Sequence, residues 1–325
     1  MPLDITFAVC ATRQDVVNAV NVLRESPYVV LDCEGKELGM DDGALSLICV
    51  GTAFAQFVFL FDVVALTRYD LQPLLSFLGG KVMKVVWDGR MDFIELWSTY
   101  NVSIGKNVCD LQVAEVLSRS NFRGERDDER LSRLATYFGP QVWKNPLQFA
   151  GIHRVVGLQQ CLEENGYRGL VGKDPEVTKM HRQNDTKAWL VRPLPWKLLC
   201  YAAADIYLIA LLYEDFSAKG WLPLGTKFFG RCNRYVTMHE QFGRIRKETG
   251  RFRSGPLIPF GILNGGEPKG CWKTTCNTCG RNMTLFAFET DGHGSRRRVC
   301  RLCWFVAEKF SVSCDSRWVQ ISISL

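Results

Sequence analysis

The apolar pattern of the chain changes its period at Leu66, and this change indicates the class of fold to expect. Before Leu66, three runs with short connections are typical of β-strands: residues 28–35, 44–52 and 57–62. Beyond it, helix-like stretches alternate with short buried runs. Three consecutive strands predict an antiparallel meander, and the helices that follow return the chain to the same sheet. The sequence therefore predicts an α/β fold, with a mixed sheet and flanking helices.

Two carboxylates end the first of these strand-like runs, YVVLDCEG. Side chains alternate between the faces of a strand, so Asp32 and Glu34 share one face and Cys33 takes the other, as a core cysteine. Two acids side by side repel each other unless a cation lies between them. The alternative is a strand end that runs into a solvated acidic turn.

Three further residues extend this pattern on predicted helices. Asp92 falls in the first turn of a helix at 90–99, while Tyr201 and Asp205 are four residues apart on one face of a long helix after Pro195. Each has an ordinary alternative, because acids favour helix N-termini and a Tyr–Asp pair can simply hydrogen-bond on a packed surface. If all four carboxylates converge at one end of the sheet, two hard cations such as Mg²⁺ or Mn²⁺ are needed to hold them together.

Four of the thirteen cysteines form two C-x-x-C pairs separated by twenty residues: Cys276, Cys279, Cys300 and Cys303. Four thiolates with this spacing suit one tetrahedral Zn²⁺. The run MTLFAFE, a DGHG turn and RRRVC read as two strands between the pairs, which predicts a small zinc ribbon. Cys271 and His293 fit the ligand spacing less well, and free or disulfide-bonded cysteines in a loose tail are the alternative.

The formal net charge of +6 is concentrated toward the C-terminal part. Residues 231–253 carry seven Lys or Arg against two Asp or Glu, a net charge of +5, and Arg281 and residues 296–298 add to it. This distribution indicates a nucleic-acid footprint. A ribbon that binds a protein, or that is purely structural, is the alternative.

The chain shows no secretory signal and no run of about 18 apolar residues. We therefore expect an intracellular protein, in the nucleus or the cytoplasm, with no membrane partner.

Taken together, these motifs resemble the DEDD 3′-5′ exonuclease superfamily in its tyrosine branch. VVLDCEG, LSLICVGT and VFLFDV resemble the first strands of RNase D and of Werner-type exonuclease domains, and WDGRMD resembles the second motif of the egalitarian-like branch. RPLPWKLLCYAAADIYLIALLY resembles the third motif of RNase D. Cys200 precedes Tyr201, so the H-x-x-x-x-D pattern of the histidine branch is not found at this helix, and Trp87 stands where many relatives have His. The resemblance covers about residues 5–216 and implies an RNase H-like fold with a two-metal site.

The resemblance also implies a role for each site residue. Asp32 would bridge both cations, Glu34 and Asp205 would complete the cation that activates water, and Asp92 would serve the second cation. Tyr201 would orient the attacking water. Arg90 is a weak candidate for a phosphate contact, and its alternative is a surface helix arginine.

The sequence thus predicts three parts: an exonuclease domain at 1–222, a basic segment with a Gly/Pro-rich linker at 223–269, and a four-cysteine zinc module at 270–325. The expected activity is metal-dependent hydrolysis of RNA or single-stranded DNA from the 3′ end, which releases nucleoside 5′-monophosphates. The cofactors would be two Mg²⁺ or Mn²⁺ and one structural Zn²⁺. One alternative is a non-catalytic nucleic-acid-binding or scaffold protein on the same fold, and another gives the zinc module a protein partner.

Overall fold

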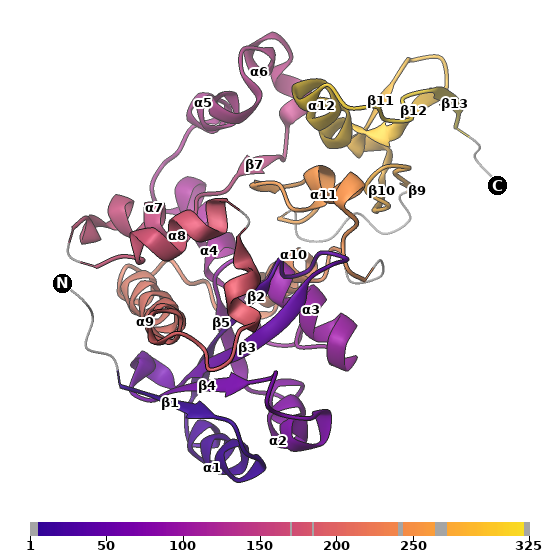
Figure 1. The fold of residues 1–325 in the computed structure, drawn as a ribbon. Helices are drawn as coiled ribbons and strands as arrows, with labels where there is room; N and C mark the ends of the chain where they lie inside the picture. The colour runs from indigo at the N-terminus through magenta and orange to yellow at the C-terminus, as the bar shows by residue number, and fades with distance from the viewer. Residues whose placement is uncertain (1–5, 170, 184, 240–242, 264–271, 322–325) are drawn as a thin grey trace. The chain divides into compact units, whose positions relative to one another are not determined.

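The computed structural model describes residues 6–321 except 170, 184, 240–242 and 264–271 (Figure 1). The chain forms two compact units that are interleaved along the sequence: unit 1 holds residues 1–115 and 156–244, and unit 2 holds 116–155 and 245–325. These units differ from the sequence-based division at 222 and 269, which stays a prediction. Cys271 and much of the Gly/Pro-rich linker, residues 264–269, lie outside the described residues.

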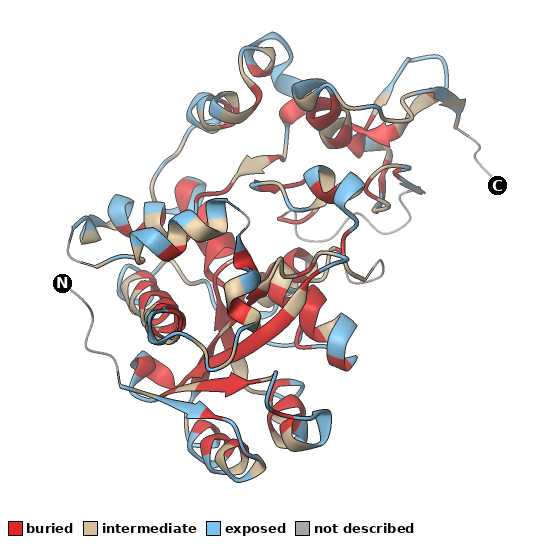
Figure 2. Ribbon diagram, viewed as in Figure 1, coloured by how far each residue is buried: buried red, intermediate tan, exposed pale blue. Residues whose placement is uncertain are grey.

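Unit 1 is built on a six-stranded mixed sheet with the order β1-β4-β3-β2-β5-β6. The strands are β1 (Phe7–Cys10), β2 (Tyr28–Lys36), β3 (Ala44–Gly51), β4 (Val58–Asp62), β5 (Met83–Val86) and β6 (Val108–Asp110). The predicted meander is confirmed, because β2, β3 and β4 pair antiparallel. β1 is parallel to β4, and β5 and β6 extend the sheet from β2 in parallel. The central strands are almost entirely buried (Figure 2), as expected for a sheet that helices cover on both faces.

The helices of unit 1 follow local sequence signals. They are α1 (Arg13–Arg24), α2 (Arg68–Leu78), α3 (Arg90–Tyr100), α4 (Leu111–Asn121), α7 (Leu158–Leu162), α8 (Pro175–Arg182), α9 (Trp196–Ala218) and α10 (Thr226–Val236), with short turns η1 (Ala53–Ala55), η3 (Glu163–Tyr167) and η4 (Thr186–Leu190). α4 begins in unit 1 and ends in unit 2. Thr12 and Thr67 each close a capping box with an aspartate three residues later, which defines the starts of α1 and α2.

The long helix α9 is the core helix of unit 1. By length and composition alone it could cross a membrane, but 61% of its most apolar stretch is buried inside the protein. It contacts β2, β3, β4 and β5, and its small residues Ala202 and Ala203 are fully buried. This contact places one face of α9 directly against the strand that carries Asp32 and Glu34.

The helix α10 lies in a stretch that the sequence analysis interpreted as a basic segment between domains. In the structure it belongs to unit 1 and contacts α3 and β6. Its buried side chains Phe228, Cys232 and Tyr235 recur at helical spacing, so the segment is amphipathic as well as basic.

Unit 2 combines a short helical region with the cysteine module. Its elements are α5 (Asp127–Phe138), α6 (Gln141–Lys144), η2 (Pro146–Phe149), β7 (His153–Arg154), α11 (Lys247–Arg253), β8 (Leu257–Ile258), β9 (Lys273–Thr275), β10 (Asn282–Thr284), η6 (Leu285–Ala287), β11 (Phe288–Thr290), β12 (Ser295–Cys300), α12 (Arg301–Phe310) and β13 (Trp318–Gln320). One hydrophobic core joins the α5–η2 region to Leu257, Phe305 and Val306. A second core surrounds the four cysteines.

Candidate active site

The strand β2 presents Asp32 and Glu34 at the end that continues past its pairing with β5. The pairing of β2 with β5 ends at Val30 and Val85, so the two acids follow the last paired residues. A bulge interrupts the β2–β3 ladder between Glu34 and Gly35. A side chain on Gly35 would meet the carbonyl oxygen of Ala44 at 2.2 Å, so only glycine allows this close approach.

The helix α9 brings Asp205 to these two acids. One carboxylate oxygen from each of Asp32, Glu34 and Asp205 lies within 4.8 Å of the others. The structure therefore joins strand and helix in one cluster of carboxylates, as the sequence analysis expected. Cys33 is buried, 4% exposed, as expected for a core cysteine.

Asp92 lies beside this cluster but not within it. It occupies the first turn of α3 and is 7% exposed. The backbone N–H of Cys33 is close enough to Asp32 and Asp92 to lower the pKa of both carboxyls, which places the two acids near each other.

Burial raises the pKa of all four carboxyls, and repulsion by neighbouring carboxylates adds to this for Asp32, Glu34 and Asp92. Desolvation, with the charge of Asp205, raises the pKa of Asp32 to about 7. Desolvation is also the largest cause of the raised pKa of Glu34, Asp92 and Asp205. Such a site holds its charge only with a compensating cation.

A lysine and a histidine that the sequence analysis did not assign to the site complete its surroundings. The Nζ atom of Lys173 lies 2.5 Å from Oδ2 of Asp205 and 3.1 Å from the hydroxyl of Tyr201. His181, on α8, stacks on the ring of Tyr201, and its Nε2 lies 3.9 Å from Oε2 of Glu34. Burial and the nearby Lys173 lower the pKa of His181 to about 4, so this imidazole is neutral at pH 7.

Tyr201 keeps its proton in this environment. Burial and the negative charge of Asp205 raise the pKa of its phenol. At neutral pH the hydroxyl is therefore a hydrogen-bond donor that points toward the carboxylate cluster.

The residues present fit hard divalent cations. Carboxylate oxygens are the ligands that Mg²⁺ and Mn²⁺ prefer. The Oδ1 atom of Asp205 is buried and has no hydrogen-bond partner in the part of the chain that the structure describes. A buried carboxylate oxygen without a partner is costly, and a bound cation would satisfy it.

Arg90 is buried, so the alternative interpretation of it as a surface helix arginine is wrong. It is 3% exposed, and its guanidinium binds the carboxylate of Asp88 through two nitrogens, Nε at 2.5 Å and Nη2 at 2.7 Å. It also lies over the ring of Tyr235 from α10. This network holds the turn before α3, so a phosphate contact by Arg90 requires the ion pair to open and stays a prediction.

The second cluster of ligand atoms lies in unit 2. One sulfur from each of Cys276, Cys279, Cys300 and Cys303 is within 4.8 Å of the others. The edge of a tetrahedron with Zn–S bonds of about 2.3 Å is about 3.8 Å long, so the four sulfurs suit one Zn²⁺. Hydrogen bonding among the thiols lowers the pKa of Cys276 and raises that of Cys300, because sulfurs this close cannot all lose their protons without a cation.

Of the two strands predicted between the cysteine pairs, RRRVC lies in β12, which pairs antiparallel with β11. MTLFAFE is not one strand: it is divided among β10, which pairs with β9, the turn η6, and β11. The second cysteine pair begins a helix, which the ribbon interpretation did not contain: Cys300 is the N-cap of α12 and accepts a hydrogen bond from the backbone of Cys303. The module is therefore a strand-and-helix unit around the four sulfurs.

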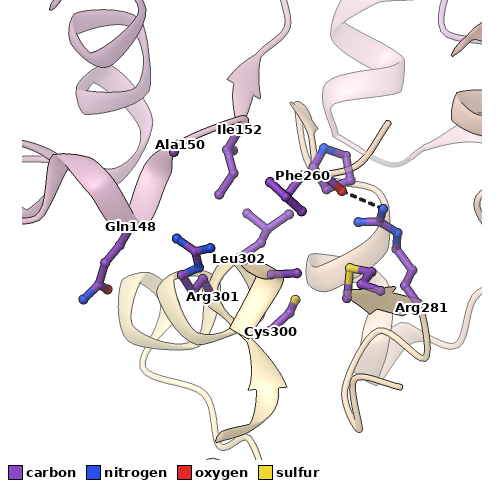
Figure 3. A pocket seen from close by; sticks show the side chains of 11 residues that line it. Gln148, Ala150, Ile152, Phe260, Arg281, Cys300, Arg301 and Leu302 are labelled. Carbon is purple, nitrogen blue, oxygen red and sulfur yellow. Dashed lines mark hydrogen bonds between the residues drawn. The ribbon is translucent and has the colours of Figure 1, made fainter. Parts of the chain in front are cut away.

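The arginines of this module already have protein acceptors. Figure 3 shows Arg281 donating to the carbonyl oxygen of Phe260, at 2.9 Å, beside a small apolar cavity that Cys300 and Leu302 also line. That cavity, about 10 Å³, has room for about one water and not for a ligand. Arg297 lies against the rings of Trp304 and Trp318 and binds Glu289. These guanidiniums contribute to the fold of the module as well as to its charge.

Comparisons with known proteins identify the fold. No family model matches the sequence, and no curated protein does. Among solved structures, RNase D of Trypanosoma brucei matches with a TM-score of 0.56 at 22% sequence identity, over 87% of this chain and 95% of that one. The same enzyme in complex with RNA U12 matches with a TM-score of 0.55 at 21% identity, over 86% of this chain and 92% of that one. The protein therefore has the fold of RNase D.

Proposed function

We propose that the protein is a metal-dependent 3′-5′ exonuclease that releases nucleoside 5′-monophosphates. One observation carries this proposal: Asp32, Glu34 and Asp205 converge from β2 and α9, with Asp92 and Tyr201 beside them, on the fold of RNase D. All five residues that the family pattern requires are present in order.

The roles we propose follow from the arrangement of the side chains. Asp32, Glu34 and Asp205 would hold one cation, and Asp32 with Asp92 would hold a second. Such cations supply an activated water and neutralise charge on the phosphodiester. Tyr201, which keeps its proton, donates a hydrogen bond that orients the attacking water. Water adds to phosphorus, the bond to the preceding 3′ oxygen breaks, and that oxygen leaves with a proton as a new 3′ hydroxyl.

The charge distribution supports a nucleic acid as the substrate. Unit 2 contains 20 Lys or Arg against 10 Asp or Glu, a net charge of +10, whereas unit 1 contains 20 against 24, a net charge of −4. We propose that unit 2, with a structural Zn²⁺ on its four cysteines, provides the electrostatic attraction for the strand. Recruitment of a protein by the zinc module is the second candidate, because its arginines are engaged in structural contacts.

The test is one degradation assay on the full chain. Oligonucleotides of RNA and of DNA, single- and double-stranded and labelled at the 5′ end, are incubated with Mg²⁺, with Mn²⁺ or with neither. We expect a ladder that shortens from the 3′ end only when a divalent cation is present. The comparison of RNA with DNA assigns the substrate, which the sequence and the fold leave open.

The place of the protein in the nucleus or the cytoplasm stays a prediction.

Two variants separate catalysis from binding. Asp205→Asn removes the charge at the cluster, and Asp215→Asn, ten residues later on α9, is the matched control. We expect at least a 100-fold loss of rate for the first and less than a twofold change for the second. Strand binding without any degradation, in the wild type under all cation conditions, would establish the non-catalytic alternative.

A further inference from the structure

A second open cavity lies in unit 1, at the opposite end of the parallel strands from the carboxylate cluster. Its volume is about 350 Å³, within the range of about 300–1,000 Å³ for small-molecule sites. It is lined by Gly79, Gly80, Lys81, Gly105, Lys106, Asn107, Phe229, Gly230 and Asn233, and is called here the glycine–lysine pocket. The loops that line it precede β5 and β6, whereas the acids follow the part of β2 that pairs with β5. β2, β5 and β6 are parallel, so the two sites are at opposite ends of these strands.

The glycines give this pocket its shape. A side chain on Gly105 would meet Oδ1 of Asn233 at 2.7 Å, so the loop before β6 and helix α10 approach as closely as only glycine permits. A Cβ atom on Gly230, in contrast, would have Nη1 of Arg234 as its nearest neighbour, at the ordinary contact distance of 3.6 Å. Much of the wall is therefore peptide backbone, which can approach a ligand directly.

The charge of the pocket is uniformly positive. The three segments that form it, residues 79–87, 101–109 and 226–239, contain six Lys or Arg and no Asp or Glu. The charge of these segments is opposite in sign to that of unit 1 as a whole, which carries a net charge of −4. Within the described part of the chain, neither Lys81 nor Lys106 forms a hydrogen bond or ion pair through its ammonium group, and both are exposed. Two ammonium groups at the mouth of a cavity without acids select an anion.

Other lining groups narrow the class of anion. Phe229 is half-buried and offers a ring to an aromatic partner. The side-chain amide of Asn107 donates to the carbonyl oxygen of Lys81, which holds the two loops together. The amide of Asn233 makes no side-chain hydrogen bond with another described residue, and it can donate or accept. Positive charge, a ring and an amide in a cavity of this size suit a phosphate joined to a planar base.

We propose that the glycine–lysine pocket is a second nucleotide site, which binds a nucleotide phosphate through Lys81 and Lys106 and a base beside Phe229. The choice of a nucleotide over other phosphate esters rests on the proposed function. The same chemistry is offered by a free mononucleotide, the proposed product, and by one nucleotide of a longer strand. The experiment below distinguishes these two sources.

The test measures binding without divalent cations. Zinc-loaded full chain in buffer that lacks Mg²⁺ and Mn²⁺ is titrated by calorimetry with AMP, with inorganic phosphate and with a single-stranded 12-nucleotide RNA. Under these conditions the carboxylate cluster lacks the divalent cations through which it would bind a phosphate in the proposed function. A failure of the exonuclease assay therefore leaves this experiment unaffected, and each result can be judged separately.

Two changes to the pocket each have a matched control. The double variant Lys81→Ala/Lys106→Ala removes both ammonium groups, and Arg24→Ala removes an exposed charge at the end of α1. Gly230→Glu places an acid at the wall of the pocket, and Gly230→Ala adds a methyl group without charge. Thermal unfolding of all four variants shows that they remain folded.

We expect AMP affinity to fall about tenfold or more in the double variant and in Gly230→Glu, and to stay within about twofold in the controls. If only the affinity for the RNA falls in these two variants, the occupant is one nucleotide of a longer strand. In that case the double variant should also release about two fewer counterions on binding RNA, measured from the salt dependence of its affinity. The proposal is overturned if neither ligand loses affinity in these variants. It is also overturned if inorganic phosphate binds as tightly as AMP, because the site would then recognise no nucleotide.

Discussion

Lys173 places a positive charge inside a cluster that the sequence analysis described as acidic. Its ammonium group contacts Asp205 and Tyr201. Desolvation alone would lower the pKa of Lys173, but the attraction of Asp205 and Tyr201 raises it, so the group is charged at neutral pH. The lysine therefore partly compensates the repulsion between the carboxylates before any cation binds.

Replacing Lys173 by methionine should strengthen cation binding in the absence of substrate. Lys173→Met removes a positive charge next to Asp205 and leaves the carboxylates with less compensation. We expect Mn²⁺ affinity to rise several-fold, measured by calorimetry or by the loss of the free Mn²⁺ resonance signal. Lys179→Met, an exposed lysine on α8, is the control and should leave the affinity unchanged. Equal or weaker Mn²⁺ binding in Lys173→Met would show that the lysine does not compete with the cation.

Tyr201→Phe tests the phenol without removing the ring. The stacking with His181 and the burial of the ring remain, while the donor toward the attacking water is lost. We expect the rate of degradation to fall about 10–100-fold, and Mn²⁺ affinity to stay within about twofold. A full rate in Tyr201→Phe would remove the hydroxyl from the mechanism.

For single residues, the sequence predicted the positions of the acids better than the positions of the residues around them. Asp32 and Glu34 could be placed together because strand alternation is a strict geometric rule, and Tyr201 and Asp205 because residues four apart share a helix face. Lys173 precedes a helix whose start is marked by Asp174 and Pro175, but no local rule states which way a residue before a helix points. Its contact with Asp205 depends on how two separate elements pack.

The same holds for single helices and strands: features set by local sequence could be predicted, and features set by packing could not. The starts of α1 and α2 follow from capping boxes, and the meander follows from short loops. The parallel pairing of β1 with β4 has no local signal, because it joins segments about fifty residues apart. The role of α10 in unit 1 was also missed, since its basic residues obscured the apolar spacing of Phe228, Cys232 and Tyr235.

The strand β5 contains a buried lysine whose charge should cost stability. Lys84 is fully buried, and its Nζ donates at 3.0 Å to the carbonyl oxygen of Leu78 at the end of α2. Burial lowers the pKa of Lys84 to about 8 from 10.5. Between these two pH values the unfolded chain holds a proton that the folded chain has lost, so this contribution to stability rises with pH there and is constant below pH 8.

Lys84→Met should therefore raise the free energy of unfolding. We expect a gain of about 1–3 kcal/mol at pH 7, after the loss of the bond to Leu78, and a smaller gain as the pH rises from about 8 to 10. Urea denaturation followed by circular dichroism at several pH values measures both. Lys144→Met, an exposed lysine on α6, should change stability by less than about 0.5 kcal/mol. A gain that did not shrink above pH 8 would contradict a titrating Lys84.

In the whole molecule, we propose that unit 1 performs catalysis and that unit 2 attracts the nucleic acid. Unit 1 holds the carboxylates and carries a net negative charge, whereas unit 2 carries the excess of positive charge and the four cysteines. The sequence predicted the cysteine site from spacing alone. It did not predict that residues 116–155 would share a core with residues near the C-terminus, because such contacts have no sequence period.

The second core of unit 2 should depend on zinc. The four sulfurs lie at its centre with Met283, Phe288 and Val299 around them, and a structural zinc site supplies about 10–16 kcal/mol. We expect Cys300→Ser to lose its zinc, measured by mass spectrometry of the metal, and to become sensitive to protease after residue 271. Cys314→Ser, a cysteine at the border of this core, should keep one zinc per chain. Unchanged protease resistance in metal-free Cys300→Ser would contradict a structural zinc.

The interleaving of the units has a consequence for the order of events during synthesis. Every residue of unit 1 has been made once Arg244 is added, but unit 2 then has only residues 116–155. The apolar residues of α5 and η2 share their core with Leu257, Phe305 and Val306, so their partners do not yet exist. During synthesis, unit 1 can therefore fold while residues 116–155, which lie between its two stretches of sequence, are still unfolded. The last 81 residues, which carry the four-cysteine cluster, decide when that segment folds.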